Sequence, residues 1–67
     1  MTQKKISDRE FVDALNICLK HYSVGDVANS LNFSIPTVRR WSQGKNLPYK
    51  TMRPSVLRGI LSLLQFE

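Results

Sequence analysis

The segment "SVGDVANSLNFSIPTVRRWSQG", residues 23–44, gives the clearest indication of the fold, because it holds the signals of two short helices close together. Ser23 and Ser34 each precede a segment with apolar residues at helical spacing, and serine is a preferred residue at the N-cap of a helix. The spacing predicts helices over residues 24–32 and 35–43. A tight connection between two such short helices is typical of a helix-turn-helix.

The second of these helices has two different sides. Val38 and Trp41 lie three residues apart, so they share one side, and we expect them to anchor the helix to the rest of the domain. Arg39 and Arg40 project from other sides of this helix. Pro36 falls in the first turn, where its missing N–H costs nothing. The helix is therefore expected to be held by its apolar side and to present arginine to its surroundings.

Two further helices flank this pair. Ser7, followed three residues later by Glu10, forms a capping box that starts a helix over residues 7–22. Beyond a polar loop, an apolar segment predicts a last helix over residues 54–65. No run of strand-like alternation is present. The sequence therefore predicts an all-α chain, in which residues 1–67 form one compact domain of four, or at most five, helices around a central helix-turn-helix.

The last predicted helix is apolar over roughly 220° of its circumference, which is wider than one core contact needs. Two interpretations remain open: a second subunit covers part of this surface, or the small domain wraps around a central helix. Gly59 is suited to a close helix approach. We expect self-association as a homodimer, and the interface candidates are Leu57, Leu61, Leu64 and Phe66.

The charge of the chain is distributed unevenly. The 67 residues carry a formal net charge of +5. Within residues 1–34 the lysines and arginines balance the acidic residues, whereas residues 35–67 hold six basic residues against Glu67 alone. Such asymmetry indicates a polyanionic partner, although a merely basic, soluble surface is the alternative.

Several other classes of protein are disfavoured. Cys18 is the only cysteine, so no internal disulfide forms, and with His21 it supplies two of the four ligands that structural zinc needs. We therefore expect no metal and no cofactor. No apolar run approaches the roughly 20 residues of a membrane span, and no signal peptide is recognisable, which favours the cytoplasm. No catalytic triad, carboxylate pair or phosphate-binding glycine loop is present, so an enzyme is not expected.

Small, turning, capping and basic positions recur here at a familiar spacing: Ala28, Asn32, Ser34, Thr37, Val38, Arg40, Trp41, Gly44 and Lys45. Over residues 23–48 this spacing resembles the helix-turn-helix of the phage repressor and Cro family. Asn32 replaces that family's usual turn glycine, and Val24 replaces a glutamine that often binds phosphate. The final segment more loosely resembles the small repressors associated with anti-CRISPR operons.

The resemblance implies a transcriptional regulator that binds double-stranded DNA, with the recognition helix, residues 35–43, in the major groove. The expected regulator is a repressor that acts by operator occupancy, as a homodimer on an inverted-repeat operator. Base readout is assigned to the exposed first part of that helix. The candidates are Ile35, Pro36, Arg39 and Arg40. For either arginine a phosphate contact is the alternative, and Arg40, beside Trp41, is the better placed of the two to lie along the DNA backbone. A protein-interaction module on the same fold, antitoxin-like or antirepressor-like, is the alternative.

Phosphate contacts are expected at the start of the recognition helix and in the loop that follows it. Tyr49 is expected to pack within that loop, and Arg58 to be a solvated charge. For Ser34 a capping role is equally compatible with the sequence. The candidates are Ser34, Thr37, Gln43, Lys45, Asn46, Lys50 and Arg53.

Overall fold

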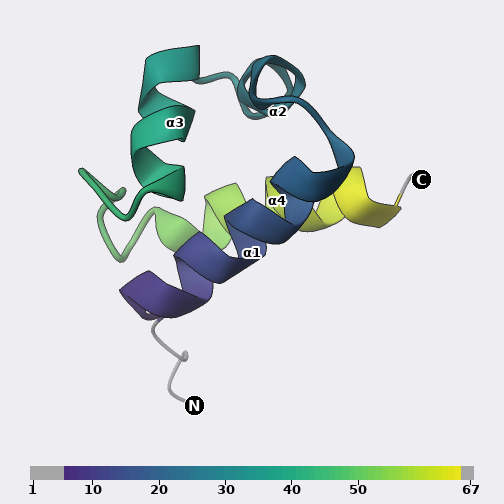
Figure 1. Cartoon of the computed structure of the whole chain (residues 1–67). Helices are drawn as coiled ribbons and strands as arrows, with labels where there is room; N and C mark the ends of the chain where they lie inside the picture. Colours follow the sequence, from purple (N-terminus) through teal and green to yellow (C-terminus); the bar gives the residue numbers. More distant parts are fainter. Residues whose placement is uncertain (1–5, 66–67) are drawn as a thin grey trace.

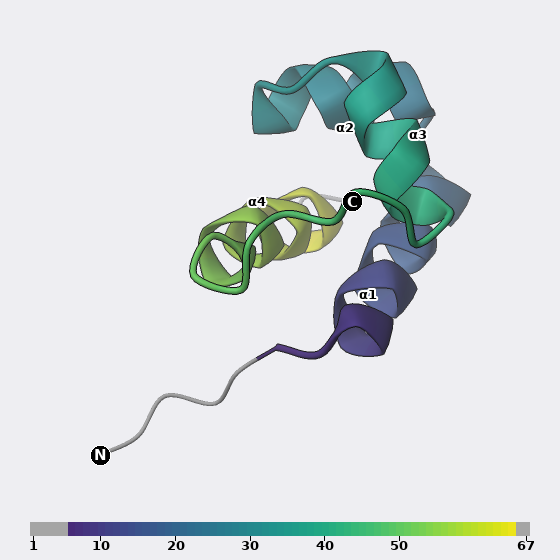
Figure 2. The same cartoon turned by 90° about the vertical axis from the view of Figure 1, so that its left-hand side faces the viewer.

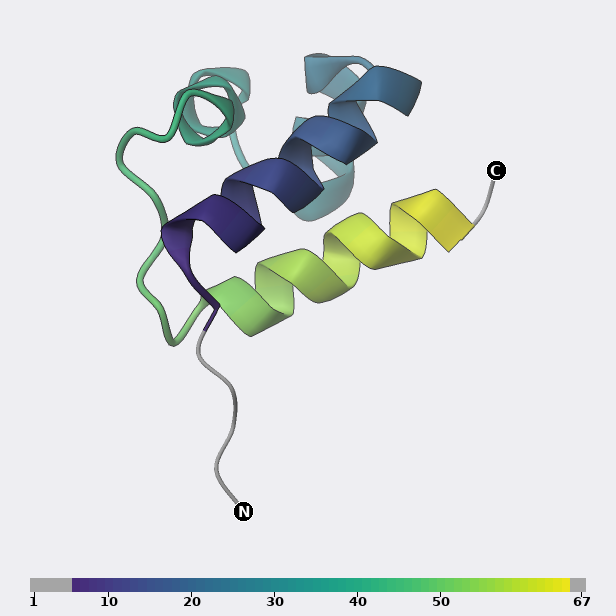
Figure 3. The ribbon, with the colours of Figure 1, turned by 60° about the horizontal axis from the view of Figure 1, so that its bottom comes forward.

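The computed structural model describes residues 6–65. This part of the chain forms four α-helices joined by loops and contains no strand. The prediction of an all-α fold is confirmed, and every predicted helix end lies within one residue of the observed end. α1 and α4 run side by side in the same direction, and α2 and α3 cross above them (Figures 1 and 3). The bounds are Asp8–His21 for α1, Val24–Leu31 for α2, Ile35–Ser42 for α3 and Arg53–Gln65 for α4.

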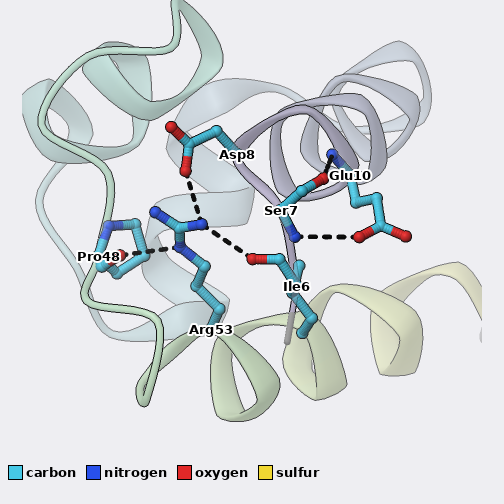
Figure 4. A network of polar contacts seen from close by, with 6 residues as sticks. All are labelled: Ile6, Ser7, Asp8, Glu10, Pro48 and Arg53. Carbon is cyan, nitrogen blue, oxygen red and sulfur yellow. Dashed lines mark hydrogen bonds and ion pairs between the residues drawn. The ribbon is translucent and has the colours of Figure 1, made fainter. Parts of the chain in front are cut away.

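Serine side chains start the first three helices. Ser7 Oγ accepts a hydrogen bond from the backbone N–H of Glu10 at 3.1 Å, and the Glu10 carboxylate accepts one from the Ser7 N–H at 3.0 Å (Figure 4). Ser23 and Ser34 likewise accept from the N–H three residues later. Asn32, with φ of 64°, adopts the left-handed conformation that ends α2. These local signals explain why the helix ends are predictable.

All four helices contribute to one small core. Gly59 of α4 allows α2 to approach closely, because an added Cβ would lie 2.5 Å from Cδ2 of Leu31. α2 and α3 are only two turns long, so tertiary packing must stabilise them. The buried apolar residues are Phe11, Leu15, Cys18, Val27, Ala28, Val38, Trp41, Val56 and Ile60.

The apolar breadth of α4 is largely used inside the domain, because α4 packs against both α1 and α2. Leu57 and Leu64 are half-buried against the core, whereas Leu61 is exposed. The Tyr22 hydroxyl donates a hydrogen bond to the Leu63 carbonyl at 2.8 Å and so ties the end of α1 to α4. Phe66, the fourth predicted interface residue, lies outside the described residues. The breadth of this helix therefore does not by itself require a second subunit.

The prediction that Arg53 contacts a DNA phosphate is wrong. Arg53 is buried at the start of α4, and its Nε donates to the Pro48 carbonyl at 3.0 Å (Figure 4). Its Nη1 donates to the Ile6 carbonyl at 2.9 Å and lies 2.7 Å from Asp8 Oδ1. Arg53 thus fastens the loop between α3 and α4 to the start of α1, and its guanidinium is not available to a ligand.

Candidate nucleic-acid interface

One side of α3 is fixed firmly to the domain. Val38 and Trp41 are buried, and the Trp41 ring meets Phe11 and Phe33 edge-on, with centroid separations of 5.7 and 4.8 Å. The indole Nε1 donates a hydrogen bond to the Asn46 carbonyl at 2.9 Å. Trp41 therefore anchors α3, as its helical spacing from Val38 predicts. It also holds the first part of the loop that follows α3, which the sequence does not predict.

The opposite side of α3 is exposed and basic. Arg39, Arg40, Pro36 and Gln43 are all exposed, and at 100° per residue they fall within about 100° of one another around the helix. Ile35, at the first position of α3, is 42% exposed. No aspartate or glutamate occurs in the sequence between Asp26 and Glu67, so no acidic side chain from this part of the chain offsets the two guanidiniums.

Two hydroxyl side chains, those of Ser34 and Thr37, lie at the N-terminal end of α3. Ser34 Oγ accepts a hydrogen bond from the Thr37 N–H at 3.3 Å and lies 2.7 Å from Thr37 Oγ1. The capping role of Ser34 is therefore confirmed. Ser34 is exposed and Thr37 is half-buried, so the pair lies at the edge of the basic face.

Replacing Ser34 by alanine is expected to lower the free energy of unfolding by about 1 kcal/mol, because the Thr37 N–H loses its acceptor. Urea unfolding followed by far-UV circular dichroism measures this change. Ser30→Ala is the matched control, since Ser30 is exposed inside α2. A loss for Ser34→Ala no larger than that of Ser30→Ala would contradict the capping role.

The loop after α3 runs on the same side of the molecule as α3 (Figures 1 and 2), and it carries further exposed polar groups. Gly44 and Asn46 have φ of 78° and 49°, so the chain turns sharply as it leaves α3. Lys45 and Lys50 are exposed, as are the predicted contact residues Gln43 and Asn46. The hydrogen bonds of Trp41 and Arg53 to loop carbonyls hold this loop at two points.

The prediction that Tyr49 packs within the loop is wrong, since its side chain is 80% exposed. Its neighbour Pro48 is the buried residue at this point of the loop. The Tyr49 carbonyl accepts hydrogen bonds from the N–H groups of Met52 and Arg53, so the backbone turns into α4 and the ring points outward. Tyr49 therefore joins the exposed groups beside Lys50. The sequence carries no clear signal for this, because buried and exposed loop tyrosines look alike in a single sequence.

The described part of the chain shows neither a metal-binding cluster nor a membrane-spanning helix. Within residues 6–65, no three His, Cys, Asp or Glu side chains gather where a metal ion could bind. None of the helices described has the combined length and apolar character needed to cross a membrane. Comparison of the chain with protein-family models, with curated proteins and with solved structures finds no match in any of the three.

Proposed function

We propose that this protein is a sequence-specific regulator of transcription that binds double-stranded DNA with α3 in the major groove. One observation carries the proposal: Arg39 and Arg40 are exposed on a short helix whose other side is fixed by Val38 and Trp41. A recognition helix needs such a division, because its outer side chains must reach base edges without losing their orientation. The protein then acts in the cytoplasm, as a homodimeric repressor that occupies an inverted-repeat operator.

In this proposal, base readout comes from the outer side of α3. Arginine can donate two hydrogen bonds to O6 and N7 of guanine, which is the commonest specific contact in the major groove. Arg39 and Arg40 are the two candidates for that contact. Ile35 and Pro36 offer apolar contact, for example with a thymine methyl group. The expected half-site therefore contains G·C pairs flanked by thymine.

The backbone of the DNA is contacted by groups around this helix. The Lys45 and Lys50 ammonium groups supply charge, and the Tyr49 hydroxyl can donate to a phosphate oxygen. Because the loop is tied down at both Asn46 and Pro48, these groups hold a fixed position relative to α3. The polar candidates that complete the set are Ser34, Thr37, Gln43 and Asn46.

Arg39→Ala and Lys45→Ala are expected to affect DNA binding differently. Loss of a base contact at Arg39 should reduce discrimination at one G·C pair by roughly 1–3 kcal/mol. Loss of a phosphate contact at Lys45 should weaken binding to all sequences and make the log–log salt slope shallower by about 0.9. Selection of bound sites from random duplexes, followed by titrations at several salt concentrations, measures both effects.

The same experiment separates the proposal from its alternative. A protein-interaction module would select no sequence from random duplexes, and Arg39→Ala would leave its behaviour towards DNA unchanged. Selected sites without guanine enrichment would contradict base readout by the two arginines. Binding that does not weaken with salt would contradict the phosphate contacts.

A further inference from the structure

An apolar surface away from α3 has no covering segment among residues 6–65. α1 and α4, which lie side by side in Figure 3, each contribute one exposed apolar side chain to this surface. Ile17 of α1 is 48% exposed and Leu61 of α4 is 54% exposed. Half-buried Leu57 and Leu64 lie beside Leu61 at helical spacing and connect the exposed patch to the core. We call this surface the α1–α4 face.

Two contacts set the relative level of the helices in this face. Arg53 meets Asp8 at the start of both helices, and the Tyr22 hydroxyl meets the Leu63 carbonyl near their ends. Because the helices run in the same direction between these contacts, Ile17 lies at about the level of the segment 57–61 of α4. The two exposed apolar side chains are therefore close to level with each other across the face.

Charged side chains flank the two apolar residues in a matching order. Asp13 lies one turn before Ile17 on α1, and Arg58 lies about one turn before Leu61 on α4. Asp13 is exposed, and its i,i+4 ion pair with Arg9 is long, at 3.8 Å. Arg58 is also exposed. Each helix thus presents a charge followed by an apolar group, and the two charges are opposite.

We propose that a second copy of this chain covers the α1–α4 face, related by a two-fold axis parallel to α1 and α4. This axis places α1 on α4 of the partner subunit and keeps each residue at its own level. Ile17 then meets the partner subunit's Leu61, and Asp13 meets the partner subunit's Arg58. Both pairs occur twice, as a two-fold interface requires.

Charge selects a second copy over an acidic partner. α1 carries Asp8, Glu10 and Asp13 against Arg9 and Lys20, so it is slightly acidic, whereas Arg58 is the exposed charge of α4. The basic residues of α3 and its loop lie outside this contact. A dimer that brought these two cationic surfaces together would be disfavoured by their mutual repulsion. The direction of the axis also places both α3 helices at the same end of the dimer, an argument that rests on the proposed function.

The proposal is tested without DNA, so its failure is distinguishable from a failure of DNA binding. Sedimentation equilibrium should show a dimer for the natural chain. Asp13→Arg and Arg58→Asp should each weaken it by about tenfold or more, because like charges then face each other. The double variant should recover most of the lost affinity. A natural chain that remains monomeric at every concentration, or a double variant weaker than both single ones, would overturn the proposal.

Cysteine cross-linking tests the pairing of the helices. Cys18 is buried and stays in place. An equimolar mixture of Ile17→Cys chains and Leu61→Cys chains should form a covalent dimer on mild oxidation, whereas Ile17→Cys alone should not. Asn29→Cys, on the exposed side of α2, is the control for random collision. Efficient cross-linking of Ile17→Cys alone would show α1 against α1 of the partner subunit and would overturn the arrangement.

Discussion

Replacing Trp41 by alanine is expected to leave the chain largely unfolded at 25 °C. Truncating a buried aromatic side chain to alanine costs about 3–5 kcal/mol, and a single core in so small a domain supplies no more than about that amount. Trp41 also contacts Phe11 and Phe33 and donates a hydrogen bond to the Asn46 carbonyl. Far-UV circular dichroism and urea unfolding measure the loss.

Two further variants show that the loss comes from burial. Trp41→Phe keeps a ring in the core but loses the Nε1 donor, so it should retain a cooperative transition at reduced stability. Tyr49→Ala removes an aromatic side chain that is 80% exposed, and its effect should stay within about 0.5 kcal/mol. A Tyr49→Ala loss comparable to that of Trp41→Ala would contradict the anchoring role of Trp41.

Replacing Arg53 by methionine is expected to lower the free energy of unfolding by roughly 2–3 kcal/mol. Methionine fills similar space, but the carbonyls of Pro48 and Ile6 lose their donor and Asp8 loses its ion pair. The loop between α3 and α4 should also become more accessible to proteases. Urea unfolding and limited proteolysis with chymotrypsin, which can cut after Tyr49, measure the two effects.

Arg40→Met is the matched control for Arg53→Met, because it removes an exposed guanidinium from α3. Its stability should change by no more than about 0.5 kcal/mol, while its DNA binding should weaken. The opposite result, with Arg53→Met as stable as the natural chain, would mean that the buried network is not what holds the loop.

The helix ends could be predicted from the sequence because their causes are local. Ser7, Ser34 and Asn32 act on backbone groups within a few residues of themselves. The two sides of α3 also follow from spacing alone, since Val38 and Trp41 repeat at helical distance. Most candidate contact residues, Arg39 and Arg40 among them, are accordingly exposed where the sequence predicts.

The roles of Arg53 and Tyr49 could not be predicted in this way. In the sequence, Arg53 cannot be distinguished from the other basic residues in the second half of the chain. Its role follows from the fold, which places Asp8 and the Ile6 carbonyl against its guanidinium. In the sequence Tyr49 resembles a packing residue, whereas in the structure Pro48 is buried and Tyr49 is exposed. In both cases the environment of the side chain depends on how the loop between α3 and α4 packs against the rest of the domain.

For this protein, then, the sequence by itself determined the four helices, their caps and the two-sided character of α3, because these depend on contacts within one or two helical turns. Three features follow from the tertiary structure alone: Arg53 is buried and holds the loop between α3 and α4, Tyr49 is exposed, and α1 and α2 cover most of the apolar surface of α4. Burial depends on which distant segments meet, and a helical pattern does not specify that meeting. The same packing left Ile17 of α1 and Leu61 of α4 exposed.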